Sequence, residues 1–478
     1  MTDNIRHLSV KGVKWSASES FITHGISFVV GLVIARILSP SDYGTVGMLS
    51  VFMAVSKAFV NSGFGSALIR TKDRTEDDYT TAFLFNVTVG ALFYGILFLS
   101  APAIAAFYEM PILKDVLRVF AITLIINALH IVPSTKLTVA VNFKTQAIIG
   151  LVAALVSGGT GIWMAYAGYG VWALVWQSIV SAIVSTTLLW IATRWKPWEG
   201  RFTRFSFKRL FAFGSRLLGS NLLHILYKNV STVFIGKFYT PADLGYYSRG
   251  QSIAELPSSQ MIGVMQRVSY PVFAQLQDDE PRLCRAYRHY QRLSSMIIFF
   301  LITLLAAVAK PLVLLVLTEK WLGAVPFLQI FCLALVFDHI CQINNNMIMV
   351  KGRSDLFLRL EIIKKVVTFP LLILAIPYGV MAICLVPVVH ELVDLALGTY
   401  CVRNKLGMSE AQPLTDYGYY LPLAIVSCVP AFLLCHSGIS PWVSLPVAIL
   451  SAFGIYYLIL CRNENMKELI QIVRKELF

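Results

Sequence analysis

The chain is a succession of apolar segments, each long enough to cross a bilayer core as a helix of about 20 residues. Fourteen such segments can be placed, at 13–38, 44–70, 79–107, 114–138, 146–168, 171–193, 210–238, 244–270, 289–317, 323–350, 356–376, 379–402, 417–435 and 440–461. Only 14% of the 478 residues are charged, whereas soluble domains average about 25%. Because lipid offers no hydrogen bonds to an open backbone, the sequence predicts an all-α polytopic membrane protein.

One eleven-residue pattern occurs twice, as Ile34–Gly44 (IARILSPSDYG) and Ile235–Gly245 (IGKFYTPADLG). In each copy a Ser or Thr suited to a helix N-cap precedes a Pro at the first helical position and an Asp that can reach back to the cap. An even number of segments separates the copies, so both halves enter the membrane in the same direction. Parallel repeats are typical of transporters whose two bundles rock about a shared axis, which predicts that the two turns lie on one rim and approach or separate.

The repeat predicts two six-helix bundles followed by two further helices. The first half is expected to consist of an amphipathic N-terminal segment (1–12) and the first bundle (13–193). A linker (194–209) leads to the second bundle (210–402), which is followed by the last two spans (417–461) and a tail (462–478). The linker contains Trp195 and Trp198 among basic residues. This composition is typical of a bilayer interface, where aromatic rings and Lys lie at headgroup depth.

Basic residues distinguish the two sides of the membrane. Of the 40 Lys and Arg, 30 fall in the termini or in loops on the N-terminal side and six on the opposite side. The positive-inside rule therefore predicts that both termini are cytoplasmic. Attraction to anionic inner-leaflet lipid accounts for the net charge of +14, and no nucleic-acid partner is expected.

A few ionisable residues lie deep in the apolar segments, where a charge facing lipid is costly and a charge facing a cavity is not. We expect a basic cavity lining from Lys57, Arg216, Lys228 and Arg249, with Glu19 and Glu255 as acidic members and His224, Tyr227, Asn61 and Gln266 as polar ones. Two alternatives stay open. Arg216 and Arg249 lie near segment ends, from which they could snorkel to the interface. Glu19 or Glu255 could neutralise a lysine instead of coupling an ion.

Two further polar groups, Asp338-His339 and His390-Glu391 with Asp394, could be interpreted as a metal or proton site. The second group lacks the second histidine of a His-Glu-x-x-His zinc motif. Hydrogen bonding between helices is the favoured interpretation. We therefore expect no catalytic residue, metal or cofactor, and coupling to H⁺ or Na⁺ stays open.

Motifs in the second half carry a family resemblance. They are Arg267–Pro271, Gln275–Asp279, Glu319–Trp321, Pro326–Ile330 and Lys351–Asp355. With the repeated turn, they resemble the polysaccharide-exporter branch of the multidrug/oligosaccharidyl-lipid/polysaccharide flippase superfamily, in particular Wzx-type proteins similar to colanic acid exporters. The resemblance implies a fourteen-helix fold with a central cavity lined largely by spans 1, 2, 7 and 8.

The function implied by the resemblance is the transfer of an undecaprenyl-pyrophosphate-linked repeat unit to the periplasmic leaflet by alternating access. The implied location is a bacterial inner membrane, and the implied partners are the lipid-linked oligosaccharide, membrane lipids and the polysaccharide polymerase and chain-length machinery. Two alternatives are a drug exporter of the same superfamily and a membrane polymerase or ligase acting on the same glycan. The expected outer loops are too short for the large catalytic loop of a polymerase. A basic excess in the cavity suits a pyrophosphate or acidic sugar better than a cationic drug.

Overall fold

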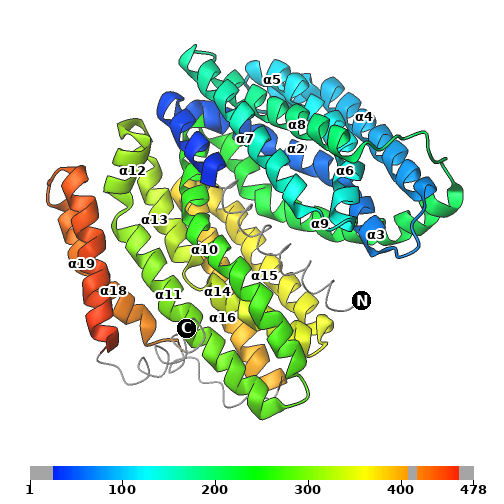
Figure 1. Cartoon of the computed structure of the whole chain (residues 1–478). Coiled ribbons are helices and arrows are strands. Elements are labelled where there is room, and N and C mark those ends of the chain that lie inside the picture. The colour runs from blue at the N-terminus through cyan, green and yellow to red at the C-terminus, as the bar shows by residue number, and fades with distance from the viewer. Residues whose placement is uncertain (1–24, 407–416, 462–478) are drawn as a thin grey trace. The chain divides into compact units, whose positions relative to one another are not determined.

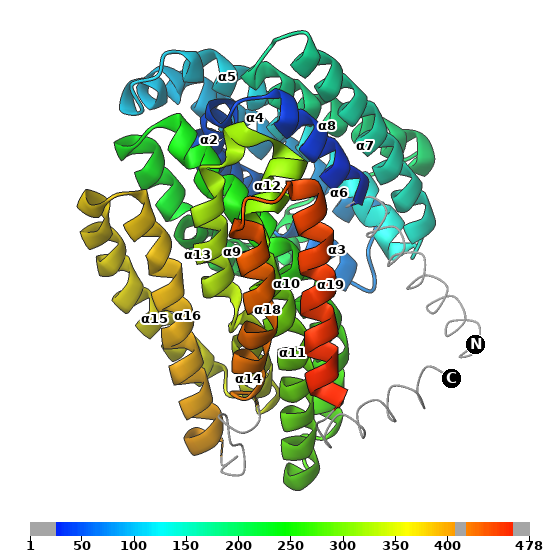
Figure 2. The same ribbon diagram turned by 90° about the vertical axis from the view of Figure 1, so that its left-hand side faces the viewer.

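The computed structural model describes residues 25–406 and 417–461, and within these ranges the regular structure is entirely helical. The chain divides into two compact units, Met1–Gly245 and Tyr246–Phe478, here called the first and second units. Figures 1 and 2 show their helices from two directions.

The first unit begins with a helix at Gly25–Ile37. It continues with α2 (Pro40–Asn61), α3 (Phe64–Arg70), α4 (Glu76–Phe107), α5 (Ile112–Phe120), α6 (Ile122–Val139), α7 (Phe143–Tyr166), α8 (Val171–Thr193) and α9 (Arg204–Phe238). α7 packs against α8, and α6 packs against both α4 and α8, so these helices run side by side (Figure 1). α9 packs against α2, α3 and α4.

The next helix, α10 (Pro241–Gln275), has its first turn in the first unit and the rest in the second. The second unit continues with α11 (Glu280–Ala307), α12 (Ala309–Leu317), η1 (Glu319–Trp321), α13 (Ala324–Leu335), α14 (Asp338–Val350), α15 (Ser354–Ala375), η2 (Ile376–Tyr378), α16 (Val380–Tyr400), η3 (Cys401–Lys405), α18 (Tyr420–His436) and α19 (Pro441–Cys461). Figure 2 shows α18 beside α19 and α11, with which it packs.

The prediction of about fourteen spanning helices is confirmed. Nine stretches of the described chain are long and apolar enough to cross a membrane, and Gly25–Ile37 and Tyr420–His436 are shorter apolar helices. The other three predicted segments, at 210–238, 244–270 and 356–376, correspond to the long helices α9, α10 and α15, which lack a stretch both as apolar and as poor in charge as those of the nine. Of the charges that these helices carry, Lys364 on α15 is buried and paired with carboxylates, as expected for a charge in a spanning segment.

Four predicted segments are divided in the structure. The segment expected at 44–70 is α2 and α3, and the segment expected at 114–138 is α5 and α6. The segment expected at 289–317 is two helices, α11 and α12, separated at Val308, and α11 begins at Glu280. The segment expected at 323–350 is likewise divided between α13 and α14. α11 starts early because its first turns are amphipathic: Leu283, Cys284 and Tyr287 are buried while basic residues point outward, so the helix extends beyond its apolar portion.

The repeated turn has the cap structure that its sequence predicts. The Ser39 hydroxyl accepts a hydrogen bond from the Asp42 N–H, and the Asp42 carboxylate accepts one from the Ser39 N–H at 2.9 Å. Thr240 and Asp243 make the same reciprocal pair, with the Thr240 hydroxyl donating to the carboxylate at 2.7 Å. Each copy therefore closes one helix and starts the next with its first N–H groups bonded.

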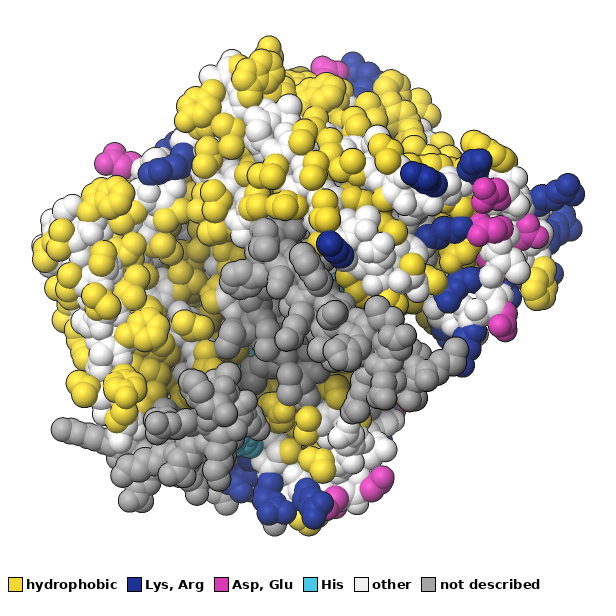
Figure 3. All heavy atoms as spheres, in the orientation of Figure 1, with side chains coloured by type: hydrophobic (Ala, Val, Ile, Leu, Met, Phe, Trp, Pro, Cys, Tyr) yellow, Lys and Arg dark blue, Asp and Glu magenta, His cyan; other side chains and the backbone are white. Residues whose placement is uncertain are grey.

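The segment before α9 is bound to the start of α4. Trp195 is buried and its indole N–H donates to the Glu76 carboxylate at 2.9 Å, while the Lys136 ammonium pairs with the same carboxylate at 2.7 Å. Arg209 forms an ion pair with the fully buried Asp78. The segment expected to be a linker is thus attached to the start of α4 by polar contacts, of which the Arg209 pair reaches a buried carboxylate. Figure 3 shows charged side chains gathered at this end, with hydrophobic side chains over most of the face it presents.

Candidate functional site

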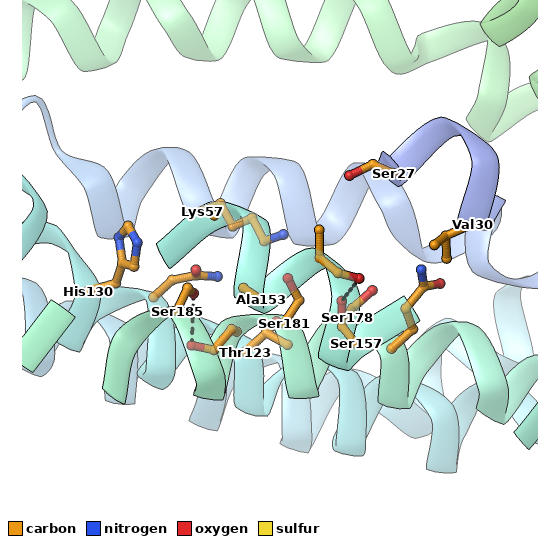
Figure 4. Close-up of a pocket in the computed structure, with 15 residues that line it drawn as sticks. Ser27, Val30, Lys57, Thr123, His130, Ala153, Ser157, Ser178, Ser181 and Ser185 are labelled. Atoms are coloured by element: carbon orange, nitrogen blue, oxygen red, sulfur yellow. Dashed lines mark hydrogen bonds between the residues drawn. The ribbon is translucent and has the colours of Figure 1, made fainter. Parts of the chain in front are cut away.

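A polar pocket lies inside the first unit, between the helix Gly25–Ile37 and helices α2, α6, α7 and α8. We call it the hydroxyl-rich pocket; its volume is about 550 Å³. Its polar lining consists of Ser27, Lys57, Thr123, Asn127, His130, Ser157, Gln177, Ser178, Ser181 and Ser185. Figure 4 shows Lys57 extending from α2 toward the space that the serines of α8 face.

Helix geometry explains why so many hydroxyls meet here. Ser178, Ser181 and Ser185 recur at intervals of three and four, which places them on one face of α8. The hydroxyls of Ser178 and Ser185 donate to carbonyls of their own helix, at 3.0 and 3.2 Å, and the Thr123 hydroxyl donates to the carbonyl of Phe120, the last residue of α5, at 2.7 Å. A hydroxyl that donates to its own helix keeps lone pairs as acceptors. The pocket can therefore accept hydrogen bonds from a polyhydroxylated ligand without leaving buried donors unpaired.

Lys57 supplies the positive charge of this pocket. Its ammonium lies 6.0 Å from the centroid of the Phe120 ring, a distance compatible with a weak cation–π contact. Among the described residues that line the pocket, none is acidic. A lysine in such a setting is suited to a phosphate or carboxylate, because an anion taken out of water needs replacement charge.

A second pocket of about 390 Å³ lies between α2, α3, α6 and α9. We call it the α2–α9 pocket; Lys57 and Asn61 line it from α2, and Leu218, Asn221 and Ile225 line it from α9. Lys57 lines both pockets. The Lys57 ammonium therefore lies between the hydroxyl-rich pocket and the α2–α9 pocket.

The predicted site residues separate into three groups. Lys57 and Asn61 line the pockets described above. On α9, His224 and Lys228 are exposed and Tyr227 is half-buried, and none of them lines either pocket. Their place in a transport site stays a prediction.

In the second unit, Arg249 is half-buried with its guanidinium carbon 6.0 Å from the Trp321 ring centroid. Glu255 accepts a hydrogen bond from Gln251 at 2.8 Å. Glu19 and the side chains of Arg216 and Gln266 lie outside the part of the chain that the structure describes.

Sequence reasoning identified Asn61 but missed several other uncharged polar residues of the two pockets. Asn127 and His130 on α6, Gln177 and the serines on α8, and Asn221 on α9 were all missed. Ser and Thr are common in spanning helices because their hydroxyls can bond to the preceding turn, so each one alone carries little signal. The recurrence of polar residues at 177, 178, 181 and 185 is the periodic signal that could have indicated a polar face on α8.

The second unit contains a buried ionic cluster on α14, α15 and α16. Lys364 forms ion pairs with Glu361 and, at 3.0 Å, with Asp394, joining α15 to α16. Ligand atoms of Cys341, Glu391 and Asp394 lie within 4.8 Å of one another. Because the Lys364 ammonium offsets the carboxylates beside it, the arrangement suits a structural bridge between helices. His339 is likewise hydrogen-bonded to Ser295, at 2.9 Å.

The fold defines a polytopic helical membrane protein, and solved structures share this fold. The chain is similar to the lipid II flippase MurJ in an inward closed conformation, with a TM-score of 0.73 and 13% identity over 93% of this chain and 97% of that one. It is also similar to an inward-facing multidrug resistance MATE transporter, with a TM-score of 0.62 and 14% identity over 82% of this chain and 99% of that one.

The family of polysaccharide biosynthesis proteins matches residues 33–326, and the chain belongs to this family. Relatives include the teichuronic acid biosynthesis protein TuaB of Bacillus subtilis, 25% identical over 73% of this chain and 72% of its own length. The succinoglycan biosynthesis transport protein ExoT of Rhizobium meliloti is 25% identical over 70% and 68%. The lipopolysaccharide biosynthesis protein WzxC of Escherichia coli is 22% identical over 90% and 88%. The resemblance stated from the motifs, to polysaccharide-exporter proteins, is confirmed.

Proposed function

We propose that the protein flips a lipid-linked oligosaccharide from the cytoplasmic to the outer leaflet of a bacterial inner membrane, for assembly of a surface polysaccharide. The observation that carries the proposal is the hydroxyl-rich pocket, which places many hydrogen-bonding groups and a lysine inside a membrane bundle. A glycan needs such a lining, because sugar hydroxyls stripped of water must find new partners. The polyprenyl tail would stay in lipid.

In this proposal Lys57 receives the anionic part of the cargo, a pyrophosphate or an acidic sugar. An ammonium in a low-dielectric cavity attracts an anion more strongly than it would in water. Arg216, Lys228 and Arg249 remain proposed members of the same basic lining, with Glu19 and Glu255 as their acidic counterparts. The names of TuaB, ExoT and WzxC support the cargo class, because they refer to the biosynthesis of teichuronic acid, the biosynthesis and transport of succinoglycan, and the biosynthesis of lipopolysaccharide.

The proposed orientation has both termini in the cytoplasm, and the proposed protein partners are the polymerase and chain-length machinery of the same polysaccharide. A reporter fused after Phe478 that is active only in the cytoplasm would support this orientation. Activity of a periplasmic reporter at that position would reverse the assignment of every loop.

Deletion of the gene tests the function. We expect lipid-linked repeat units to accumulate facing the cytoplasm and the surface polysaccharide to disappear, with both defects corrected by the wild-type gene. Normal export together with altered chain length would favour a polymerase. Increased sensitivity to cationic drugs with normal surface polysaccharide would favour the drug exporter that the MATE-like fold also allows.

Complementation with Lys57 variants tests the pocket separately from the function. Lys57→Ala should abolish export while the protein remains in the membrane, and Lys57→Arg should restore part of it because the charge is kept. Gly219→Ala is a matched control, since nothing lies within 4 Å of a Cβ at that position. Normal export by Lys57→Ala would exclude this lysine from the transport site.

A further inference from the structure

Helices α2 and α9 approach each other closely at both of their ends, and at each end glycine makes the approach possible. The two helices pack in antiparallel directions: Gly236 lies against Met48, and Gly214 lies against Ser62 and Phe64. We call the two approaches the turn closure and the far closure.

The turn closure joins the two copies of the repeated turn. A Cβ on Gly44 would overlap the carbonyl oxygen of Pro241, and a Cβ on Gly245 would overlap the carbonyl oxygen of Pro40. The contact is reciprocal, because the last residue of each copy lies on the proline of the other. Capping hydrogen bonds keep each turn rigid, so the two turns meet as preformed surfaces.

The far closure is at the other end of the same pair of helices. A Cβ on Gly214 would overlap the carbonyl oxygen of Ser62, and a Cβ on Gly63 would lie 2.9 Å from the Gly214 Cα. Gly63 has a φ of +69°, in the left-handed region that favours glycine, where α2 ends and α3 begins. Backbone therefore meets backbone here too, with no side chain between.

The α2–α9 pocket lies between these two closures. Lys57 and Asn61 follow Gly44 along α2 and precede Gly63, while Asn221 lies between Gly214 and Gly236 on α9. Along the interface between α2 and α9, the polar pocket therefore has the turn closure at one end and the far closure at the other. A cargo that passes through this pocket requires each closure to open in turn.

We propose that the two glycine closures are the alternating gates of the interface between α2 and α9, with the turn closure opening toward one side of the membrane and the far closure toward the other. The inference rests on the proposed transport function. Backbone contact through glycine is either made or lost, because packed interfaces do not deform continuously. An added methyl group prevents closure at its own end only, and so shifts the population toward the state that is open at that end.

Thiol accessibility tests the proposal. Asn61→Cys places a probe in the α2–α9 pocket, and a membrane-impermeant maleimide is added to either side of the membrane, in intact cells or inverted vesicles. The chain without the new cysteine measures the background from its eight native cysteines. Gly44→Ala and Gly245→Ala should raise labelling from the side that holds the repeated turns, and Gly214→Ala should raise it from the opposite side. An open minor state is typically about 0.1–10% populated, so a substitution that favours it has room to raise its population severalfold. We therefore expect the ratio of the labelling rates from the two sides of the membrane to change roughly ten-fold.

Matched controls are available on the same helices. A Cβ on Gly219 of α9 or Gly263 of α10 would meet nothing within 4 Å, so Ala at either position should leave both labelling rates unchanged. Equal effects of Gly44→Ala and Gly214→Ala on both sides, or no effect at wild-type membrane levels, would overturn the proposal. If the Ala variants are lost from the membrane, spin labels at Ser41→Cys and Ala242→Cys in the otherwise unchanged chain decide instead: two distance populations support the gate and a single fixed distance refutes it.

Two outcomes separate this inference from the proposed function. Unchanged accessibility with glycan export intact in the wild-type chain would reject the gates and leave the flippase. A deletion strain that still exports its glycan would reject the flippase, whatever the labelling shows.

Discussion

Replacing Asp78 with Asn should destabilise the first unit strongly. The Asp78 side chain is fully buried at the start of α4, where its carboxylate pairs with Arg209 of α9 and accepts the Thr75 N–H at 2.9 Å. Asn keeps the size and the cap but removes the charge, so Arg209 loses its counter-ion. Breaking a buried ion pair costs about 3–5 kcal/mol. We take the lower end, about 3 kcal/mol, because the Arg209 side chain is 34% exposed and water can partly compensate.

That loss is large enough to measure by thermal unfolding. A change of 1 kcal/mol moves the midpoint of a domain of 150–250 residues by about 2–4 °C, so the Asp78→Asn midpoint should fall by roughly 6–12 °C. The assay is the temperature at which the detergent-solubilised protein loses its monodisperse peak. The matched control is Asp355→Asn, which breaks the exposed Arg353 pair and should shift the midpoint by less than about 2 °C. Equal shifts for the two variants would refute the reasoning.

Three further outcomes are expected. Lys57→Met should abolish glycan export with little loss of membrane protein, measured by complementation and immunoblot, because Met keeps the bulk in the pocket and removes the charge. Lys364→Met should lower the thermal midpoint of the solubilised protein, since it leaves the Asp394 carboxylate buried without its cation, and adding Asp394→Asn should recover part of the loss. The hydrogen bond and charge of Lys237 hold the pKa of Glu109 below its ordinary value of 4.5, so the pair's small contribution to stability is present above that pH and is lost as the pH falls through the folded-state pKa. The difference in stability between Glu109→Gln and wild type should therefore be present at about pH 6 and shrink as the pH falls below 4.5; a difference that does not change with pH would contradict this.

Much of the fold could be predicted from local pattern. Apolar segment length predicted about fourteen spans, and the Ser/Thr-Pro-x-Asp-x-Gly turns predicted their own caps, because both depend on groups within a few residues of one another. The family could also be recognised from the order of short motifs. The interruption at Val308 was missed although the sequence signals it: Pro311 follows three residues later, and it has no N–H to donate to the carbonyl of Ala307, so a single continuous helix is disfavoured there.

The candidate site depended on contacts that no local pattern contains. Charge at depth identified Lys57, since a lysine facing lipid is costly wherever it lies in the fold. Asn127, His130 and the α8 serines could not be identified in the same way, because an uncharged polar side chain can be satisfied by its own helix.

The spanning segments and the repeated turn follow from the sequence, because hydropathy and helix capping act over one or two turns of chain. Only the tertiary structure shows that Gly44 lies on Pro241 and Gly245 on Pro40, across about two hundred residues. The sequence shows two similar turns. They meet because α2 and α9 pack in antiparallel directions, which brings the start of α2 beside the end of α9, where α10 begins. Glycine at those positions then decides how closely the backbones meet, a property that depends on what faces each residue and not on its neighbours in the chain.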